Sequence, residues 1–414
     1  MATYKEQNKL NVPHLRFPEF QGEWEKCKVS DLLDFYSTNS LSWDQLEYGP
    51  DNMLNLHYGL IHVGLPTMVD LSKDILPAIK KENEPKNFEL CKEGDIAFAD
   101  ASEDTNEVAK AIEFYTLEDK AVVCGLHTIH GRDKSNKTVV GYKGYAFSST
   151  AFHHQIRRIA QGTKIYSISA KNFAECYIGI PSKEEQTRIA KLLRLIDERI
   201  ATQSKLIEKL ESLIKGINLR VFLNSGINYK IREICEIKSG YSGSQLLSKK
   251  GLKVSRIETI SGHKVNMERV GYVAPFESSE NYRLRVGDIL FSNINSVEYI
   301  GNTAFIDKDY DLYHGMNLLR LTPNNMVVIP FYLYLLLNTN RMLNRFKTVC
   351  NKAVSQASIN QTELGKTVVQ IPDINAQKQI CELYQALYDK LESEKYANSL
   401  FQKQKQYLLR QLFI

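Results

Sequence analysis

Residues 94–98 read Gly-Asp-Ile-Ala-Phe and residues 287–291 read Gly-Asp-Ile-Leu-Phe, and this duplication decides the fold of the 414-residue chain. Each stretch is followed by a longer match at a constant offset of 191 residues. The matching pairs are Ile168 with Ile359, Pro181 with Pro372, Gln186 with Gln377, Ile189 with Ile380, and Phe222 with Phe413. A single offset held for more than fifty residues indicates two related structural units, so the chain repeats itself once.

Each unit has the same internal order. Short β-branched or aromatic runs come first, separated by Gly, Asn and Ser, and predict strands joined by turns. A Pro closes the last strand, and a helix follows, which Ser182 and Glu185 are predicted to open as a capping box. The sequence therefore predicts an α+β protein of four parts. They are an α/β domain at 1–181, a central helix at 182–224, a second α/β domain at 225–372 and a C-terminal helix at 373–414.

Both helices carry an apolar stripe. From Ile189 onward it has heptad spacing, broken once by Gln203, and predicts a helix of about forty residues and about 60 Å. Such a stripe needs a partner helix, because it cannot bury itself. We expect the two helices to pack as an antiparallel coiled coil with a pseudo-two-fold axis. The seam residues are Ile189, Leu193, Ile196, Ile200, Ile207 and Leu210 in the first helix and Ile380, Leu387, Leu391, Phe401 and Leu408 in the second.

The second seam is less uniform than the first. Glu394, Asn398 and Lys405 occupy seam positions. Polar residues in a seam can specify the register of a coiled coil at a cost in stability. The alternative is that the second helix frays or bends there, and the sequence leaves both interpretations open.

The bulk composition excludes several classes of site. The formal net charge of +5 permits nucleic-acid binding without establishing it. The seven cysteines form no Cys-x-x-Cys pair, which argues against disulfides and zinc and favours reduced thiols in the cytoplasm. His127 and His130 have no clear third ligand, so no metal site is expected. No run approaches the ~20 apolar residues of a membrane span.

Several motifs in combination resemble the specificity subunits of type I restriction–modification systems. Residues 12–20, Val-Pro-His-Leu-Arg-Phe-Pro-Glu-Phe, with Gly22-Glu23-Trp24, look like the N-terminal signature of many such subunits from Gram-positive bacteria. The duplicated Gly-Asp-Ile-x-Phe strand resembles the family's target-recognition core. Residues 167–189 and 358–380 resemble the end of a recognition domain and the start of a spacer helix. The resemblance covers nearly the whole chain.

The resemblance implies a DNA-recognition subunit that has no active site and no cofactor of its own. In the family, each recognition domain reads one half of a split target in double-stranded DNA, and the paired helices fix the unread gap. The helices also dock two modification subunits, which are methyltransferases that carry S-adenosylmethionine. Restriction subunits add translocation and cleavage driven by ATP and Mg²⁺. The expected setting is DNA methylation and phage defence.

Two other functions remain as alternatives. One is a stand-alone DNA-modifying enzyme such as a nuclease. Against it, the sequence has no metal-binding carboxylate set, no Asn-Pro-Pro-aromatic methyltransferase motif and no glycine-rich cofactor loop. The other is an assembly scaffold that reads no DNA. Against it, the two repeated frames carry different loops, a divergence that a scaffold does not need.

Reading DNA requires donors and acceptors in the major groove and cations on the phosphates. The longest polar insertions of each unit are therefore the candidates, together with 161–164 and 352–356, which the resemblance puts near DNA. The acidic loop from Asp100 to Glu107 can accept hydrogen bonds from cytosine N4. The candidates are Arg132, Lys134, Asn136, Lys137, Lys143 and Lys164 in the first unit and Tyr241, Ser242, Gln245, Lys249, Lys250, Asn293, Asn295, Lys352 and Gln356 in the second.

Overall fold

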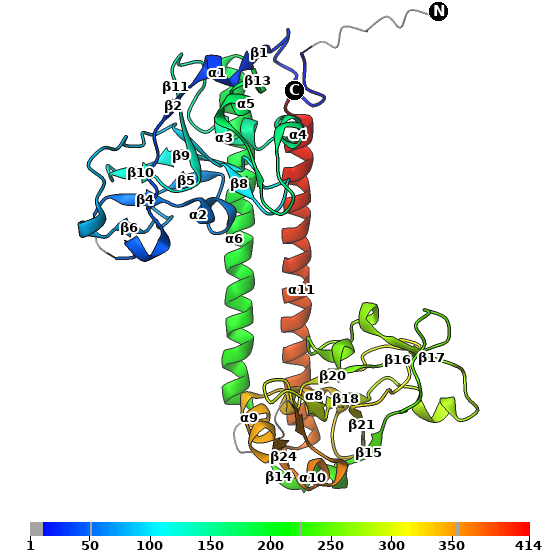
Figure 1. Ribbon diagram of the computed structural model, residues 1–414. Helices are drawn as coiled ribbons and strands as arrows, with labels where there is room; N and C mark the ends of the chain where they lie inside the picture. Colours follow the sequence, from blue (N-terminus) through cyan, green and yellow to red (C-terminus); the bar gives the residue numbers. More distant parts are fainter. Residues whose placement is uncertain (1–10, 50–51, 223–225, 353–355) are drawn as a thin grey trace, which may run out of the picture. The chain divides into compact units, whose positions relative to one another are not determined.

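The computed structural model describes residues 11–49, 52–222, 226–352 and 356–414, and the chain divides into two compact units (Figure 1). Unit 1 comprises Met1–Lys205 with Tyr396–Ile414, and unit 2 comprises Leu206–Lys395. Each unit therefore takes in part of both long helices, which the sequence had set apart as separate segments. Among the described residues, no helix combines the length and the apolar character that a membrane crossing requires.

Unit 1 is built on a five-stranded sheet in which only β5 and β9 are parallel. Its order is β2 (Leu33–Tyr36), β11 (Thr128–Asp133), β7 (Ile96–Ala99), β9 (Ala111–Thr116) and β5 (Met68–Asp70). A four-stranded sheet comprises β10 (Val122–Cys124), β4 (Leu54–Leu56), β6 (Ala78–Ile79) and β3 (Leu46–Glu47). Two strand pairs are β1 (Glu25–Lys28) with β13 (Tyr177–Ile180), and β8 (Ala101–Ser102) with β12 (Tyr166–Ser167). The short helices are α1 (Val29–Leu32), α2 (Tyr58–His62), α3 (Lys143–Phe147), α4 (Thr150–Ile159) and α5 (Ala170–Ala174).

Unit 2 has a corresponding antiparallel sheet. Its order is β15 (Cys235–Ser239), β21 (Leu318–Pro323), β18 (Ile289–Ser292) and β20 (Thr303–Phe305). Smaller sheets comprise β14 (Ile227–Lys230) with β24 (Val368–Ile371), β16 (Leu252–Val254) with β17 (Gly271–Val273), and β19 (Ile294–Asn295) with β23 (Ala357–Ser358) and β22 (Asn351–Lys352). The short helices are α7 (Ile231–Ile234), α8 (Pro330–Leu337), α9 (Asn340–Val349) and α10 (Gln361–Lys366).

The duplication predicted from the sequence is present in the backbone hydrogen bonds. In unit 1 the N–H of Ile168 donates to the Asp100 carbonyl at 3.1 Å, and in unit 2 the N–H of Ile359 donates to the Asn293 carbonyl at 2.9 Å. The strand order β2-β11-β7-β9 of unit 1 matches β15-β21-β18-β20 of unit 2. Unit 1 adds the four-stranded sheet, where unit 2 has the pair β16 and β17. The two units therefore share one frame and differ in what is inserted into it.

The Gly-Asp-Ile strand separates two cores in each unit, because successive side chains of a strand face opposite ways. Ile96 and Phe98 of β7 pack with the helices α3 to α5, whereas the neighbouring Ala97 packs with α2 and the second sheet. In unit 2, Ile289 and Phe291 face the helical core and Leu290 faces the other side. The repeated motif therefore holds the centre of each unit.

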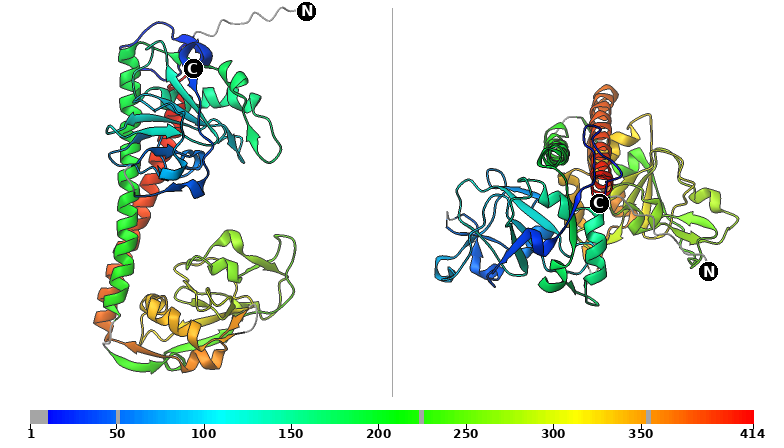
Figure 2. Two further views of the ribbon diagram at one scale, coloured as in Figure 1. Left: turned by 60° about the vertical axis from the view of Figure 1, so that its left-hand side comes forward. Right: turned by 90° about the horizontal axis from the view of Figure 1, so that it is seen from above.

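Two long helices, α6 (Lys183–Val221) and α11 (Ile374–Gln411), contribute to both units. In unit 1, Asp197 pairs with Lys405 at 2.6 Å and the Arg199 guanidinium lies over the Phe401 ring. In unit 2, Glu211 pairs with Lys395 at 2.8 Å, and the Phe222 ring lies 6.0 Å from that of Tyr384. Residue numbers rise along one helix as they fall along the other, so the paired segments run in opposite directions within each unit (Figures 1 and 2).

The predicted seam residues lie toward the cores of the units. Five of them are buried and the others are half-buried. The buried ones are Ile189, Leu193, Ile196, Leu391 and Leu408, and the half-buried ones are Ile200, Ile207, Leu210, Ile380, Leu387 and Phe401.

The helix α11 continues through its polar seam positions, so the alternative of a frayed helix is wrong. Glu394 forms an ion pair with Lys390 of the same helix, and Lys405 pairs with Asp197 of α6. These ion pairs neutralise the charges of Glu394 and Lys405 at their seam positions. The last residues of α11 and those after it belong to unit 1. There, Phe413 packs edge-on against Trp24.

The start of α6 differs in one respect from the predicted capping box. The N–H of Glu185 donates to the Ser182 hydroxyl at 3.3 Å, as a cap requires. The Glu185 carboxylate, however, is buried and accepts two hydrogen bonds of 2.8 Å from Arg16. The side chain that was expected to close the box instead anchors the N-terminal segment, because Arg16 offers a bidentate partner.

A buried glutamine ties each long helix to its own domain. The Gln186 amide donates to the carbonyls of Pro181 and Lys137, both at 2.9 Å, and accepts from the N–H of Val139 at 2.9 Å. The equivalent Gln377 donates to Pro372 and Val327 and accepts from the N–H of Ile329. Both glutamines are fully buried. One side chain thus satisfies three backbone groups that would otherwise be buried without partners.

We expect Gln186→Leu and Gln377→Leu each to destabilise the protein by about 2–4 kcal/mol, because buried backbone groups lose their partners. Urea unfolding of the full chain measures this. Gln385→Leu is the matched control, because Gln385 is exposed on α11. Equal effects at Gln377 and Gln385 would contradict the proposed role of the buried amide.

Candidate nucleic-acid interface

In both units, the segment after the Gly-Asp-Ile strand pairs with the segment before the last strand. In unit 1, β8 pairs with β12. In unit 2, β19 pairs with β23, which also pairs with β22. The fold thereby brings the candidates Asn293 and Asn295 close to the segment that carries Lys352 and Gln356. Residues 353–355 of that segment lie outside the described residues.

The remaining candidates of unit 2 lie in the segment after β15, which reaches the same end of the sheet. Ser239 at the end of β15 pairs with Leu319, and Leu319 pairs with Phe291 near the end of β18. The ring of Tyr241 stacks on Phe276 at 4.0 Å and is half-buried. Tyr241 therefore anchors the segment after β15, and Phe276 covers one face of its ring. The exposed candidates that follow it are Ser242, Gln245, Lys249 and Lys250.

The candidates of unit 1 are divided between the two ends of its sheet, because β11 runs antiparallel to β7. Lys134 follows β11 and donates to the Ser30 carbonyl at 2.7 Å. Lys137 forms an ion pair with Glu25, and Asn136 accepts from Lys183 at 3.4 Å. Lys164 is exposed at the other end, in the loop between α4 and β12.

Lys143 and Arg132 were assigned to DNA from the sequence, and the structure corrects both assignments. Lys143 is 2% exposed, and its ammonium lies 3.2 Å from the fully buried Glu113 carboxylate. Arg132 makes two hydrogen bonds of 2.8 Å to Asp95 and one of 2.6 Å to Glu89. Both cations neutralise carboxylates of the domain itself, so neither is available to a phosphate.

The repeated motif itself is structural. Gly94 and Gly287 have φ angles of 84° and 97°, which favour glycine. Asp95 and Asp288 are buried, and each accepts a 2.9 Å hydrogen bond from the backbone N–H three residues earlier. The motif therefore closes a tight turn before the central strand. The groups that face solvent lie in the loops beyond it.

Sequence reasoning missed two cations in unit 1. Arg157 and Arg158 lie in the last turn of α4, just before the loop that carries Lys164. Arg158 is exposed, and Arg157 bonds to Asn106 of the acidic loop at 3.2 Å. The signal that could have found them is the end of an amphipathic helix beside a candidate loop, where arginines often point outward.

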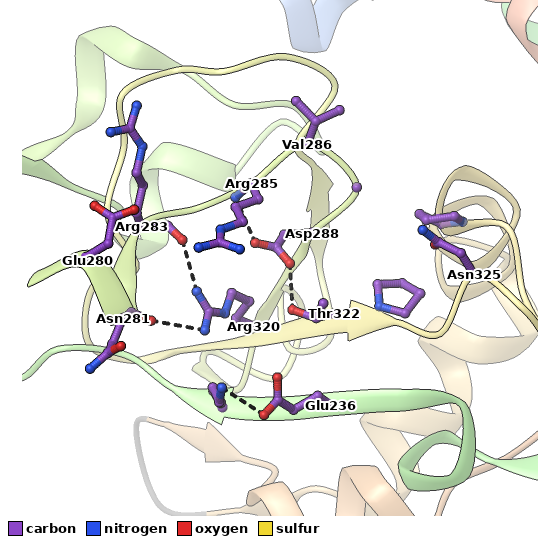
Figure 3. A pocket seen from close by; sticks show the side chains of 14 residues that line it. Glu236, Glu280, Asn281, Arg283, Arg285, Val286, Asp288, Arg320, Thr322 and Asn325 are labelled. Carbon is purple, nitrogen blue, oxygen red and sulfur yellow. Dashed lines mark hydrogen bonds and ion pairs between the residues drawn. The ribbon is translucent and has the colours of Figure 1, made fainter.

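A charged recess of about 350 Å³ lies at the opposite end of the unit 2 sheet from the candidate loops (Figure 3). Arg320 donates to the carbonyls of Arg283 and Asn281, both at 3.1 Å, and Thr322 donates to Asp288 at 2.6 Å. Arg283 pairs with Asp309 at 3.0 Å. Positive and negative groups alternate along its wall, so the recess offers no concentrated charge of one sign to a phosphate.

The model of a protein family described as "Type I restriction modification DNA specificity domain" matches residues 71–212 and 227–399, which is more than half of the chain. The chain belongs to this family. The two matched ranges reflect the duplication, because each contains one Gly-Asp-Ile strand and a large part of the long helix that follows it.

Relatives named as type I restriction enzyme specificity subunits occur in Methanocaldococcus jannaschii and Escherichia coli. A Methanocaldococcus jannaschii protein named for the type I restriction enzyme MjaX specificity subunit is 40% identical over 163 residues. That alignment spans 38% of this chain and 38% of the relative. The MjaVIII specificity subunit of the same organism is 22% identical over 100% of this chain and 96% of its own length. The EcoKI specificity subunit of Escherichia coli is 23% identical over 60% of this chain and 58% of the relative.

Solved structures agree on the fold. The type I restriction–modification S subunit from M. genitalium superimposes with a TM-score of 0.58 at 17% identity, covering 97% of this chain and 99% of that one. A chain from a structure that describes assembly and conformational transition of the type I R-M system gives a TM-score of 0.60 at 15% identity, covering 93% and 96%. The mixed α/β architecture with two domains is therefore that of the type I S subunits.

Lys143→Met is expected to destabilise unit 1 by about 3–5 kcal/mol, because it leaves Glu113 buried without a counter-charge. Burial raises the pKa of the Glu113 carboxyl, and two backbone N–H groups, of Gly141 and Gly144, remain its partners. The double variant Lys143→Met/Glu113→Gln should recover at least half of the loss. Urea unfolding gives both values.

Lys171→Met serves as the control, because Lys171 is an exposed lysine of the same unit. A stable Lys143→Met protein that loses affinity for DNA would restore the assignment made from the sequence.

Proposed function

We propose that this chain is the DNA-recognition subunit of a type I restriction–modification complex and performs no chemistry itself. One observation carries the proposal beyond family membership. The same pairing of two loop segments occurs in both units, and the side chains on it and beside it differ: Ser102, with Lys164 in the adjoining loop, in one unit, and Asn295 and Lys352 in the other. Two domains that share a backbone arrangement and carry different polar side chains are suited to recognise two different half-sites.

The exposed groups at this end of each sheet are of the kinds that bind DNA. Asn and Gln can form paired hydrogen bonds with adenine, and Lys and Arg bind phosphates or guanine. In unit 2 the exposed groups are Gln356 and Lys352, with the half-buried Asn295 in the paired strand β19, and in unit 1 they are Lys164 and Arg158. Two half-sites read from one face of the duplex lie about one helical turn apart or a multiple of it.

The long helices are proposed to form one antiparallel coiled coil that fixes the distance between the readers. The opposed ion pairs Asp197–Lys405 and Glu211–Lys395 support this, since the same arrangement recurs in both units. Two equivalent domains joined in this way would be related by a pseudo-two-fold axis. Such an axis would present the two half-sites in opposite orientations on the DNA.

The same helices are proposed to dock two methyltransferase subunits. Large apolar side chains remain exposed on both helices, where a partner would cover them. They are Leu195, Leu206 and Leu213 on α6 and Leu383, Tyr396, Leu400 and Tyr407 on α11. S-adenosylmethionine would bind to these partners, and ATP and Mg²⁺ to the restriction subunits. The free thiols of the chain suit the reducing cytoplasm.

Selection from randomised duplex DNA tests the function. The chain in complex with its modification subunits should enrich a bipartite site with a constant gap. Deleting one heptad from each helix, residues 207–213 and 391–397, shortens the span by about 10 Å, or about three base pairs. We therefore expect the gap to change and both half-sites to persist. Enrichment of no site would favour the scaffold, and an unchanged gap would refute the spacer role of the helices.

Lys164→Ala and Lys352→Ala should each weaken binding to specific and random DNA alike. Each should also lower the slope of log affinity against log salt by about 1, the contribution of one phosphate contact. Lys134→Ala should leave the slope unchanged, because that ammonium already bonds within the domain. Binding isotherms at several salt concentrations measure this. A changed slope only in Lys134→Ala would place the DNA at the opposite end of the sheet.

A further inference from the structure

Three buried side chains of unit 1 converge although they are far apart in the sequence. Cys91 precedes β7, Cys124 ends β10, and His130 lies in β11. Backbone hydrogen bonding holds the first two segments together, since the N–H of Cys91 donates to the Val122 carbonyl at 2.8 Å. Both sulfur atoms and a ring nitrogen of His130 lie within 4.8 Å of one another. All three residues are buried.

The separation of the sulfur atoms suits a shared metal ion. The two Sγ atoms are 3.6 Å apart. A disulfide would require about 2.05 Å. Two thiolates that bind one tetrahedral zinc ion, each at about 2.3 Å, are roughly 3.8 Å apart. The cysteines are thus separate thiols, close to the spacing that a metal ion between them imposes.

The histidine is prepared to act as a ligand. Its Nε2 lies 2.8 Å from a carboxylate oxygen of Asp95. Arg132 holds that carboxylate in place through two hydrogen bonds. In the neutral ring, a proton on Nε2 donated to this carboxylate leaves the lone pair on Nδ1, as in many zinc-bound histidines. Nδ1 is buried and has no hydrogen-bond partner. A buried acceptor of this kind is costly unless a ligand fills the position.

We propose that Cys91, Cys124 and His130 bind one thiophilic metal ion, with Zn²⁺ as the expected occupant. Each thiol releases its proton as its sulfur binds the ion, so two protons leave and two thiolates balance the charge of Zn²⁺. Among the described residues, no fourth His, Cys, Asp or Glu joins the group. One coordination position of the ion therefore remains for a small ligand. The ion would join β10, β11 and the segment before β7.

Only unit 1 has these residues. His130 pairs with Ala97 of β7, and the equivalent pair in unit 2 is Arg320 with Leu290 of β18. An arginine cannot serve as the ligand there. The proposed ion thus stabilises the recognition domain that carries the additional four-stranded sheet.

Metal analysis of the full chain, purified under reducing conditions without chelator, tests the proposal. We expect one zinc ion per chain and, with Co²⁺ in its place, the charge-transfer absorption of thiolate–cobalt bonds. Cys91→Ser, Cys124→Ser and His130→Asn should reduce the zinc content at least tenfold. Cys176→Ser, which changes another buried cysteine of unit 1, should retain it.

A second measurement uses the unaltered chain, so that the proposal can be tested even if the variants fail to fold. Mass spectrometry after alkylation should find Cys91 and Cys124 protected until a chelator is added, and then modified together. A folded chain that holds no zinc and gives no cobalt–thiolate absorption would overturn the proposal. So would a mass lower by two hydrogens with no metal, which identifies a disulfide between the two cysteines.

Discussion

The side-chain amide of one buried glutamine connects each domain to its long helix. Gln186 and Gln377 each satisfy three backbone groups on two different segments, and no water is needed to complete the set. Because the amide has a fixed geometry, these hydrogen bonds hold the first turn of each helix against its own domain. The proposed spacer role of the helices would require such a joint, since movement at the start of a helix would change the distance that it sets.

Away from this joint, the two units share their backbone pairings and differ in their side chains. The backbone pairings that hold the solvent-facing loops are the same, down to the Ile168–Asp100 and Ile359–Asn293 hydrogen bonds. The side chains around the Gly-Asp-Ile turn, in contrast, differ between the two units. Asp95 has a histidine and an arginine as partners, whereas Asp288 has Thr322. Divergence is tolerated here because each buried carboxylate still finds donors.

The proposed metal site follows from that divergence. In unit 1, the carboxylate of the repeated turn bonds to His130, and a ring nitrogen of His130 lies within 4.8 Å of two cysteine sulfur atoms. One of these cysteines, Cys124, lies in the four-stranded sheet. In the described residues of unit 2, the pair β16 and β17 stands where unit 1 has that sheet, and Arg320 occupies the position equivalent to His130, bonded to carbonyls. The same frame thus supports a metal ligand in one copy and an arginine in the other.

The sequence by itself determined the duplication, the extent of the long helices and the presence of strands such as β7, because these depend on local periodicity and on matching order. Only the tertiary structure decided which cations face solvent. The sequence predicted that Lys143 and Arg132 bind DNA, whereas in the structure they form ion pairs with Glu113 and Asp95. It also decided that Cys91, Cys124 and His130 meet. Contacts between strands distant in sequence depend on sheet order and register, which no local pattern encodes.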